Sequence, residues 1–266
     1  MATPAFREFS KANPDCTIGI AVKRLVYDSR ILDRCPYFHK IHIISDVWKG
    51  RSYRRGLKRC VQEGKEIQKA HGYEKVICIN QKPAWRYGIH KIHRTAHELG
   101  VWPLTDTRTE IYLSNEDRSE ASSWLDEHGY QENNYIFLHR QTAFPPKDLP
   151  EKVAQEFLKE LPPLPVIEVG KTYSIQERPI NFSFAILEKA RYIIVVDSVF
   201  LHAANALGKD ITKAYFAIRP GIVEEVGPLQ SNCECRESYS GYLDFLRRIY
   251  WWGQKGIYKT FFEIKK

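Results

Sequence analysis

The sequence predicts an α/β protein of two Rossmann-like domains whose mostly parallel sheets face each other across a cleft. Apolar segments of strand length alternate with polar segments of helical length, which is the order of elements in parallel sheets. Residues 192–196 are apolar throughout, as expected of a strand that is covered on both faces. Residues 101–117, with a proline and several threonines, separate the strands into two groups and are the best candidate for a linker.

The predicted strands fall into two groups along the chain. The first group is 17–22, 41–45 and 75–80, and the second is 135–139, 165–170, 191–197 and 212–218. A helix-start signal near Ser119 follows the linker. We therefore place one domain in residues 1–115 and the other in residues 116–238. Apolar residues at helical spacing predict a terminal helix within residues 239–266.

Length and hydropathy exclude a membrane-spanning protein. The chain has 266 residues, enough for one large or two small domains. No apolar run approaches the roughly 20 residues that span a bilayer, and the amino terminus has no apolar secretory segment. We therefore expect a soluble, cytoplasmic protein without a transmembrane segment.

Cysteine and histidine motifs give no strong metal signal. The six cysteines are scattered, as a reducing compartment allows, and Cys233 and Cys235 form a single Cys-x-Cys motif for which free thiols are favoured. His90, His93 and His97 share one predicted helix face, where a basic surface is favoured over a metal site. We predict no metal site.

Motifs of three common enzyme classes are absent from the sequence. The chain has no G-x-G-x-x-G, no G-x-x-x-x-G-K-[ST] and no G-x-S-x-G. Nicotinamide chemistry, P-loop phosphoryl transfer and serine hydrolysis therefore lack their usual anchors.

Positive charge is concentrated in the first part of the chain. Residues 1–110 carry a net charge of +10 and the remaining 156 residues carry −2, within a total of +8. The densest stretch, residues 49–59, has six cations in eleven residues. It includes Arg51, Arg54, Arg55, Lys58 and Arg59. A solvated helix face is the simpler interpretation, but a field of this size in one domain favours binding of a polyanion.

The turn after the predicted strand 191–197 indicates a phosphate site. Asp197 and Ser198 stand at the carboxyl end of that strand, where open α/β sheets bind ligands. A predicted helix carrying His202 follows at once, and the free N–H groups and positive dipole at its amino end favour an anion.

The same turn carries a family resemblance. VDSVFLHAANALGK resembles the Asp-Ser/Thr-Gly-x-x-His-x-x-Ala-Ala element of the heptosyltransferase-like, family 9 type glycosyltransferases, with Val199 in place of the glycine. Residues 135–150, YIFLHRQTAFPPKDLP, and residues 165–170, PVIEVG, resemble two further segments of that family in the same order. The resemblance implies the GT-B fold, in which this turn holds the diphosphate of a nucleotide-sugar. It also implies that the terminal helix crosses back to the first domain.

The resemblance implies a set of donor-binding residues. Thr142 and Lys147 are expected to meet the donor phosphates, and the segment after Gly170 is shortened, so that Glu177 is the candidate to replace the family's ribose-binding glutamate. The full set is Thr142, Lys147, Gly170, Glu177, Asp197, Ser198, Val199 and His202. Lys147 and the helix start take the place of a divalent metal, and no cofactor is expected beyond the nucleotide-sugar co-substrate.

The resemblance also implies a catalytic base just after the first strand of the acceptor domain. Asp28 is the closest positional match, although the family's preceding glycine is missing and the spacing from the lysine is one residue shorter. Asp33 is the alternative base, and a helix-capping role for Asp28 is the structural alternative.

The function implied is that of an inverting, metal-independent glycosyltransferase. It moves a hexosyl, heptosyl or pentosyl group from a nucleotide-diphosphate donor to a hydroxyl of an anionic glycan or glycolipid, held by the cationic stretch of residues 49–59. A DNA-modifying glycosyltransferase of the viral type, acting on hydroxylated bases, is one alternative. A non-catalytic GT-B binding domain is the other.

Overall fold

The computed structural model describes residues 3–44, 53–77, 79, 90–142, 147–170, 175, 178–217, 227 and 233–238. The chain forms two compact units, the first mainly from Pro4–Thr105 and the second mainly from Asp106–Phe245. Their boundary falls inside the predicted linker of residues 101–117. The predicted terminal helix lies outside the described residues, and the cleft between the domains stays a prediction.

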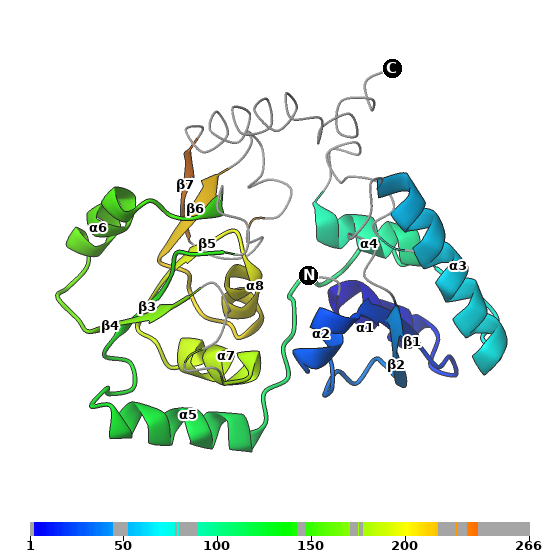
Figure 1. Ribbon diagram of the computed structural model, residues 1–266, viewed down its shortest axis with the longest axis horizontal. Helices are drawn as coiled ribbons and strands as arrows, with labels where there is room; N and C mark the ends of the chain where they lie inside the picture. Colours follow the sequence, from blue (N-terminus) through cyan, green and yellow to red (C-terminus); the bar gives the residue numbers. More distant parts are fainter. Residues whose placement is uncertain are drawn as a thin grey trace. The chain divides into compact units, whose positions relative to one another are not determined.

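Among its described residues, the first unit contains a two-stranded parallel sheet and four helices (Figure 1). Its elements are α1 (Thr3–Ala12), β1 (Gly19–Lys23), α2 (Arg24–Asp28), β2 (Lys40–Ile44), α3 (Tyr53–His71) and α4 (Lys91–Leu99). The strands pair in register from Gly19↔Lys40 to Lys23↔Ile44, so two of the three predicted strands are confirmed. The third prediction, 75–80, is wrong over residues 75–77, which have no regular secondary structure. Val76 stays 37% exposed there, so this apolar run lacks the cover of a buried strand.

The second unit is a five-stranded parallel sheet with four helices among the described residues. Its elements are α5 (Asn115–Glu127), β3 (Ile136–His139), α6 (Glu151–Lys159), β4 (Val166–Val169), α7 (Ile180–Glu188), β5 (Tyr192–Val196), α8 (Val199–Ala206), β6 (Lys213–Ala217) and β7 (Glu234–Ser238). The strand order is β4-β3-β5-β6-β7. All four predicted strands of this domain are confirmed, as is the parallel sheet.

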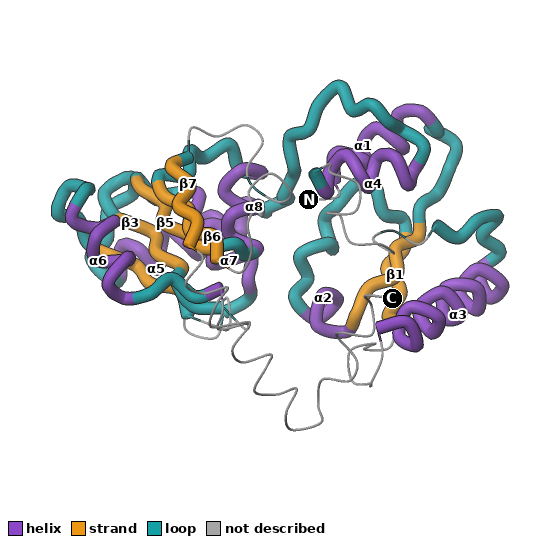
Figure 2. Tube along the Cα trace, turned by 90° about the horizontal axis from the view of Figure 1, so that it is seen from above, coloured by secondary structure: helices purple, strands orange, loops and turns teal. Residues whose placement is uncertain are grey.

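Helices cover both faces of this sheet. Ile136 and Leu138 of β3 pack with Phe157 of α6 on one face. On the other face, the ring of Phe137 lies 5.2 Å from that of Phe200 in α8. Figure 2 shows the strands between α6 and α8. Cover on both faces explains why β3 is apolar from Ile136 to Leu138 and β5 from Ile193 to Val196.

The edge strand β7 was not predicted from the sequence. Its residues, ECRES, are polar and carry no apolar run. Ion pairs attach it instead, because Lys213 of β6 contacts Glu234, and Arg236 Nη1 lies 3.0 Å from Glu156 Oε2 of α6. These partners come together only after the sheet has formed, so no local pattern announces the strand.

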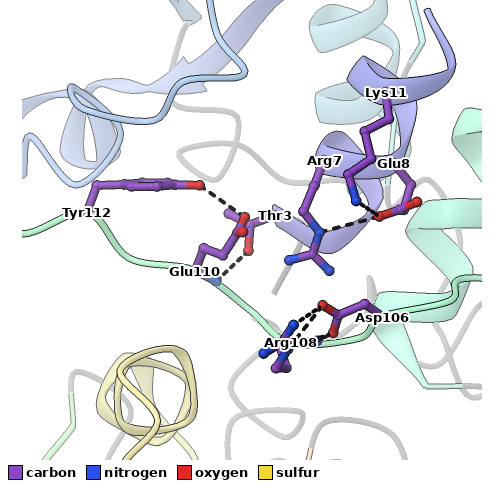
Figure 3. A network of polar contacts seen from close by, with 8 residues as sticks. All are labelled: Thr3, Arg7, Glu8, Lys11, Asp106, Arg108, Glu110 and Tyr112. Atoms are coloured by element: carbon purple, nitrogen blue, oxygen red, sulfur yellow. Dashed lines mark hydrogen bonds and ion pairs between the residues drawn. The ribbon is translucent and has the colours of Figure 1, made fainter.

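The segment between α4 and α5 is ordered by local polar contacts. Arg108 donates to both carboxylate oxygens of Asp106, and the Tyr112 hydroxyl donates to Glu110 (Figure 3). The next helix, α5, begins at Asn115 rather than near Ser119. A capping box explains the earlier start, because the Ser114 hydroxyl accepts from the Asp117 N–H and the Asp117 carboxylate accepts from the Ser114 N–H.

Candidate functional site

The strand order of the second unit defines a candidate ligand-binding edge. After β3 the chain continues to β4, which lies on one side of β3. The next strand, β5, lies on the other side of β3, and β6 and β7 follow outward from β5. Such a change of direction opens a crevice at the carboxyl ends of the two central strands, where open α/β sheets bind ligands. The turns after β3 and β5 flank this crevice, and both had been predicted to bind the donor.

The turn after β5 holds Asp197 and Ser198. Asp197 is only 8% exposed, and its N–H donates to the Tyr215 carbonyl of β6 at 3.2 Å. Ser198 is the N-cap of α8, with its hydroxyl oxygen accepting from the Phe200 N–H at 3.3 Å. Val199, which replaces the family's glycine, is the first residue of α8. His202 follows Ser198 by four residues and therefore lies on the same side of the helix.

Lys147 connects the two turns. Its Nζ lies 2.5 Å from Asp197 Oδ2 and 3.4 Å from the Asp197 carbonyl oxygen. The Lys147 side chain is 30% exposed and that of Asp197 9% exposed, so the lysine is partly open to solvent whereas the carboxylate is largely buried. The structure thus brings together two predicted site residues that are 50 positions apart in the chain.

Thr142 and Asp148 close the loop that carries Lys147. Thr142 is 2% exposed, and both its N–H and its hydroxyl donate to Asp148 Oδ1, at 2.6 and 3.1 Å. The Leu149 N–H donates to the Arg140 carbonyl at 2.8 Å, which joins the two ends of the loop. Asp148 was missed by sequence reasoning. The predicted contact of Thr142 with a donor phosphate stays a prediction.

His139 is a second site residue that sequence reasoning missed. It is the last residue of β3, is fully buried, and places Nδ1 3.1 Å from the Ser198 hydroxyl oxygen. Burial lowers the pKa of His139 to about 4, so the imidazole is neutral at pH 7. The sequence did contain a signal for His139. It is a polar residue at the end of an otherwise apolar strand, at the same sheet edge as Asp197.

Gly170 follows β4 at the same edge of the sheet. A Cβ atom added to Gly170 would meet no atom of the described residues within 4 Å, and its φ lies outside the left-handed region. Neither packing nor backbone conformation therefore demands glycine there. Glu177 lies outside the described residues.

Gly170→Ala tests whether a ligand approaches this backbone. We expect an unchanged midpoint of thermal unfolding together with affinity for a nucleotide-sugar that falls about tenfold, since overpacking by one methyl group costs about 1–3 kcal/mol. Calorimetric titration measures the affinity and a thermal melt serves as the control. Unchanged affinity would remove Gly170 from the site.

The two candidate bases lie in the first unit at exposed positions. Asp28 is the last residue of α2, with Oδ1 3.6 Å from Arg24 Nη1, and its side chain is 56% exposed. No described helix begins between Asp28 and Tyr53, so Asp28 caps no helix amino terminus. Asp33 Oδ2 receives a hydrogen bond from Arg30 Nε at 2.8 Å. The carboxylate of Asp28 is thus free to face solvent, which is compatible with a base that meets an incoming acceptor.

The predicted acceptor-binding cations gather at the start of α3. Arg54 and Arg55 belong to its first turn, while Arg51 lies outside the described residues. Lys58 and Arg59 are exposed, and Arg59 Nε contacts Glu63 Oε1 at 2.8 Å. The first turn has no acidic residue, so these cations add to the positive end of the helix dipole.

Within the described residues, no three metal-ligating side chains lie together. His90 acts as the N-cap of α4 by accepting from the Ile92 N–H, whereas His97 is exposed.

A hydrogen bond with Cys235 and burial both raise the pKa of the Cys233 thiol. None of the described helices is long and apolar enough to cross a bilayer.

Comparison with solved structures assigns the GT-B fold to this chain of two units, each with a parallel sheet and helices. The chain is similar to the crystal structure of a family 9 glycosyl transferase from Veillonella parvula, with a TM-score of 0.62 and 14% identity over 93% of this chain and 84% of that one. It is also similar to the E. coli ADP-heptose lps heptosyltransferase II, with a TM-score of 0.57 and 11% identity over 91% and 87% of the two chains. No protein-family model and no curated protein matches the sequence. The resemblance predicted from three short segments is therefore confirmed at the level of the fold.

Proposed function

We propose that this protein is an inverting, metal-independent glycosyltransferase that uses a nucleotide-diphosphate sugar. One observation carries the proposal: Lys147, Asp197 and Ser198 converge at the switch point of the second unit, beside the amino end of α8. Glycosyl transfer leaves a diphosphate whose negative charge must be stabilised, and an ammonium group with preorganised N–H donors supplies this stabilisation. The similar E. coli protein acts on ADP-heptose, which supports the same class of donor here.

A panel of nucleotide-sugars tests the donor. Ligand that binds the native state raises the unfolding temperature, so ADP-, UDP-, GDP- and CMP-linked sugars are compared by thermal shift. We expect one nucleotide class to give a clear shift, also in the presence of a chelator. No shift with any of them would contradict the proposal. A shift without transfer to any acceptor would favour a non-catalytic binding domain.

Asp28 is the proposed general base. Asp28→Asn preserves the shape of the side chain but removes its basicity, so the rate of transfer should fall by about 10²–10⁴-fold while affinity for the nucleotide-sugar stays the same. Asp33→Asn is the matched comparison. Steady-state kinetics and calorimetric titration separate the two effects. A normal rate for Asp28→Asn with an inactive Asp33→Asn would transfer the role to Asp33.

An anionic glycan or glycolipid is the proposed acceptor, since the E. coli relative is named for lipopolysaccharide. The cations at the start of α3 are the basis for the second candidate, a DNA acceptor. Both acceptors are anionic, but only a duplex presents many phosphates to one surface.

Salt dependence separates these acceptors. Binding of duplex DNA weakens linearly in log salt, with a slope of about −0.9 for each phosphate neutralised. If DNA is the acceptor, Lys58→Glu/Arg59→Glu should reduce the slope by about 2 in a gel shift, because two phosphate contacts are lost. Lys65→Glu/Lys69→Glu, two exposed cations farther along α3, is the control. Absence of duplex binding at low salt would eliminate the DNA candidate.

A further inference from the structure

We propose that His139 is a positioning residue of the phosphate site, which directs the Ser198 hydroxyl proton toward the bound diphosphate. The role rests on the proposed function, because it requires an anion at the amino end of α8. His139 does not itself touch the ligand in this arrangement. It acts through Ser198, the residue that caps the helix.

The sheet register places His139 beneath the turn. His139 of β3 pairs with Val195 of β5, so Ser198, three residues farther along, folds back over the end of β3. The imidazole ring lies 4.7 Å from the Phe200 ring of α8, which holds it from the other side. Because His139 is fully buried, water does not compete for its bond to Ser198.

Counting donors and acceptors at Ser198 gives the direction of its proton. A serine hydroxyl has two acceptor sites and one proton. The Phe200 N–H occupies one acceptor site, and in the proposed tautomer the Nδ1 proton of His139 occupies the other, across the 3.1 Å contact. The Ser198 proton is then left for a third partner, and a diphosphate oxygen is a strong acceptor at this position.

His139 also contacts the turn after β3, where a hydrogen bond to the backbone of Gln141 favours the protonated ring. A neutral imidazole with its proton on the side of the turns would connect the end of β3 to the start of α8. The opposite tautomer would accept the Ser198 proton and withdraw it from the ligand.

A double-mutant cycle tests the role with ADP and inorganic pyrophosphate as probes. His139→Phe should weaken probe binding about fivefold to tenfold, the size expected for one hydrogen bond. In a Ser198→Ala background the same change should have no further effect, because the imidazole acts only through the hydroxyl. His139→Asn, which keeps an N–H donor near the Nδ1 position, should retain most of the affinity. Nitrogen NMR of labelled histidine should find the proton on Nδ1 in the wild type.

The outcomes are distinguishable. Equal losses from His139→Phe with and without Ser198, or a proton on Nε2, would overturn the role of His139 while leaving the donor pocket in place. Failure of both probes to bind the wild type would overturn the proposed function together with this role. If His139→Phe does not fold, the asparagine variant and the NMR signal still decide.

Discussion

Lys147→Ala is expected to reduce turnover with a nucleotide-sugar by about 10²–10³-fold, the usual loss when one charge-stabilising donor is removed. The Lys147 side chain is partly exposed, and its Nζ forms an ion pair with Asp197. Its removal takes away the cation and also leaves the Asp197 carboxylate facing the leaving diphosphate. Initial rates at saturating donor measure the effect. Lys152→Ala, an exposed cation on α6 of the same unit, is the control.

A second variant separates catalysis from folding. Removing one partner of a poorly exposed ion pair leaves a charge uncompensated and destabilises the protein. Lys147→Ala/Asp197→Asn removes both charges, so it should recover much of the unfolding free energy lost in Lys147→Ala without recovering turnover. Full turnover in the double variant would show that the cation is not needed for the leaving group.

Acid is expected to destabilise the second unit through His139. Its pKa is about 4 in the folded protein and near 6.5 in an unfolded chain, so only the unfolded state takes up this proton between those values. The free energy of unfolding therefore rises with pH in this window and is lost as the pH falls from 6.5 to 4. The difference in pKa corresponds to about 3 kcal/mol. Chemical unfolding at a series of pH values measures it.

His139→Phe is the control for this pH dependence. The variant lacks the titrating group, so its free energy of unfolding should change less between pH 6.5 and 4 than that of the wild type. Burial also lowers the pKa of His42 and His93, but both residues are present in both proteins and cancel in the difference. Parallel pH profiles for the two proteins would mean that His139 titrates normally.

Local patterns predicted the parts of the fold that depend on neighbours in the chain. The central strands β3 and β5 were recognised because each is a short, mostly apolar run, and burial on both faces requires such a run. The strand β7 was missed because it is polar and is held by charged partners from other elements. Residues 75–77 were assigned wrongly because an apolar run forms a buried strand only where other elements cover it.

The start of α5 shows the same limit at close range. Ser119 looked like a helix start in the sequence, yet Ser114 has both the cap position and a reciprocal partner in Asp117. Both serines could start a helix, and they lie five residues apart. The start falls at the serine whose hydroxyl accepts from a free backbone N–H of the first turn and whose helix turns its apolar side chains toward the core. Trp124 and Leu125 are buried in the helix that results.

The sequence by itself determined the parallel sheet of this protein and predicted two neighbouring features, a phosphate-binding turn at Asp197 and Ser198 and a lysine-bearing turn before α6. These features depend on residues close together in the chain. Only the tertiary structure decided which atoms of the turns meet. Lys147 pairs with Asp197 across 50 positions and His139 bonds Ser198 across 59, because the strand order sets β3 beside β5. The order of strands depends on how whole elements cover each other, and no single segment of sequence records it.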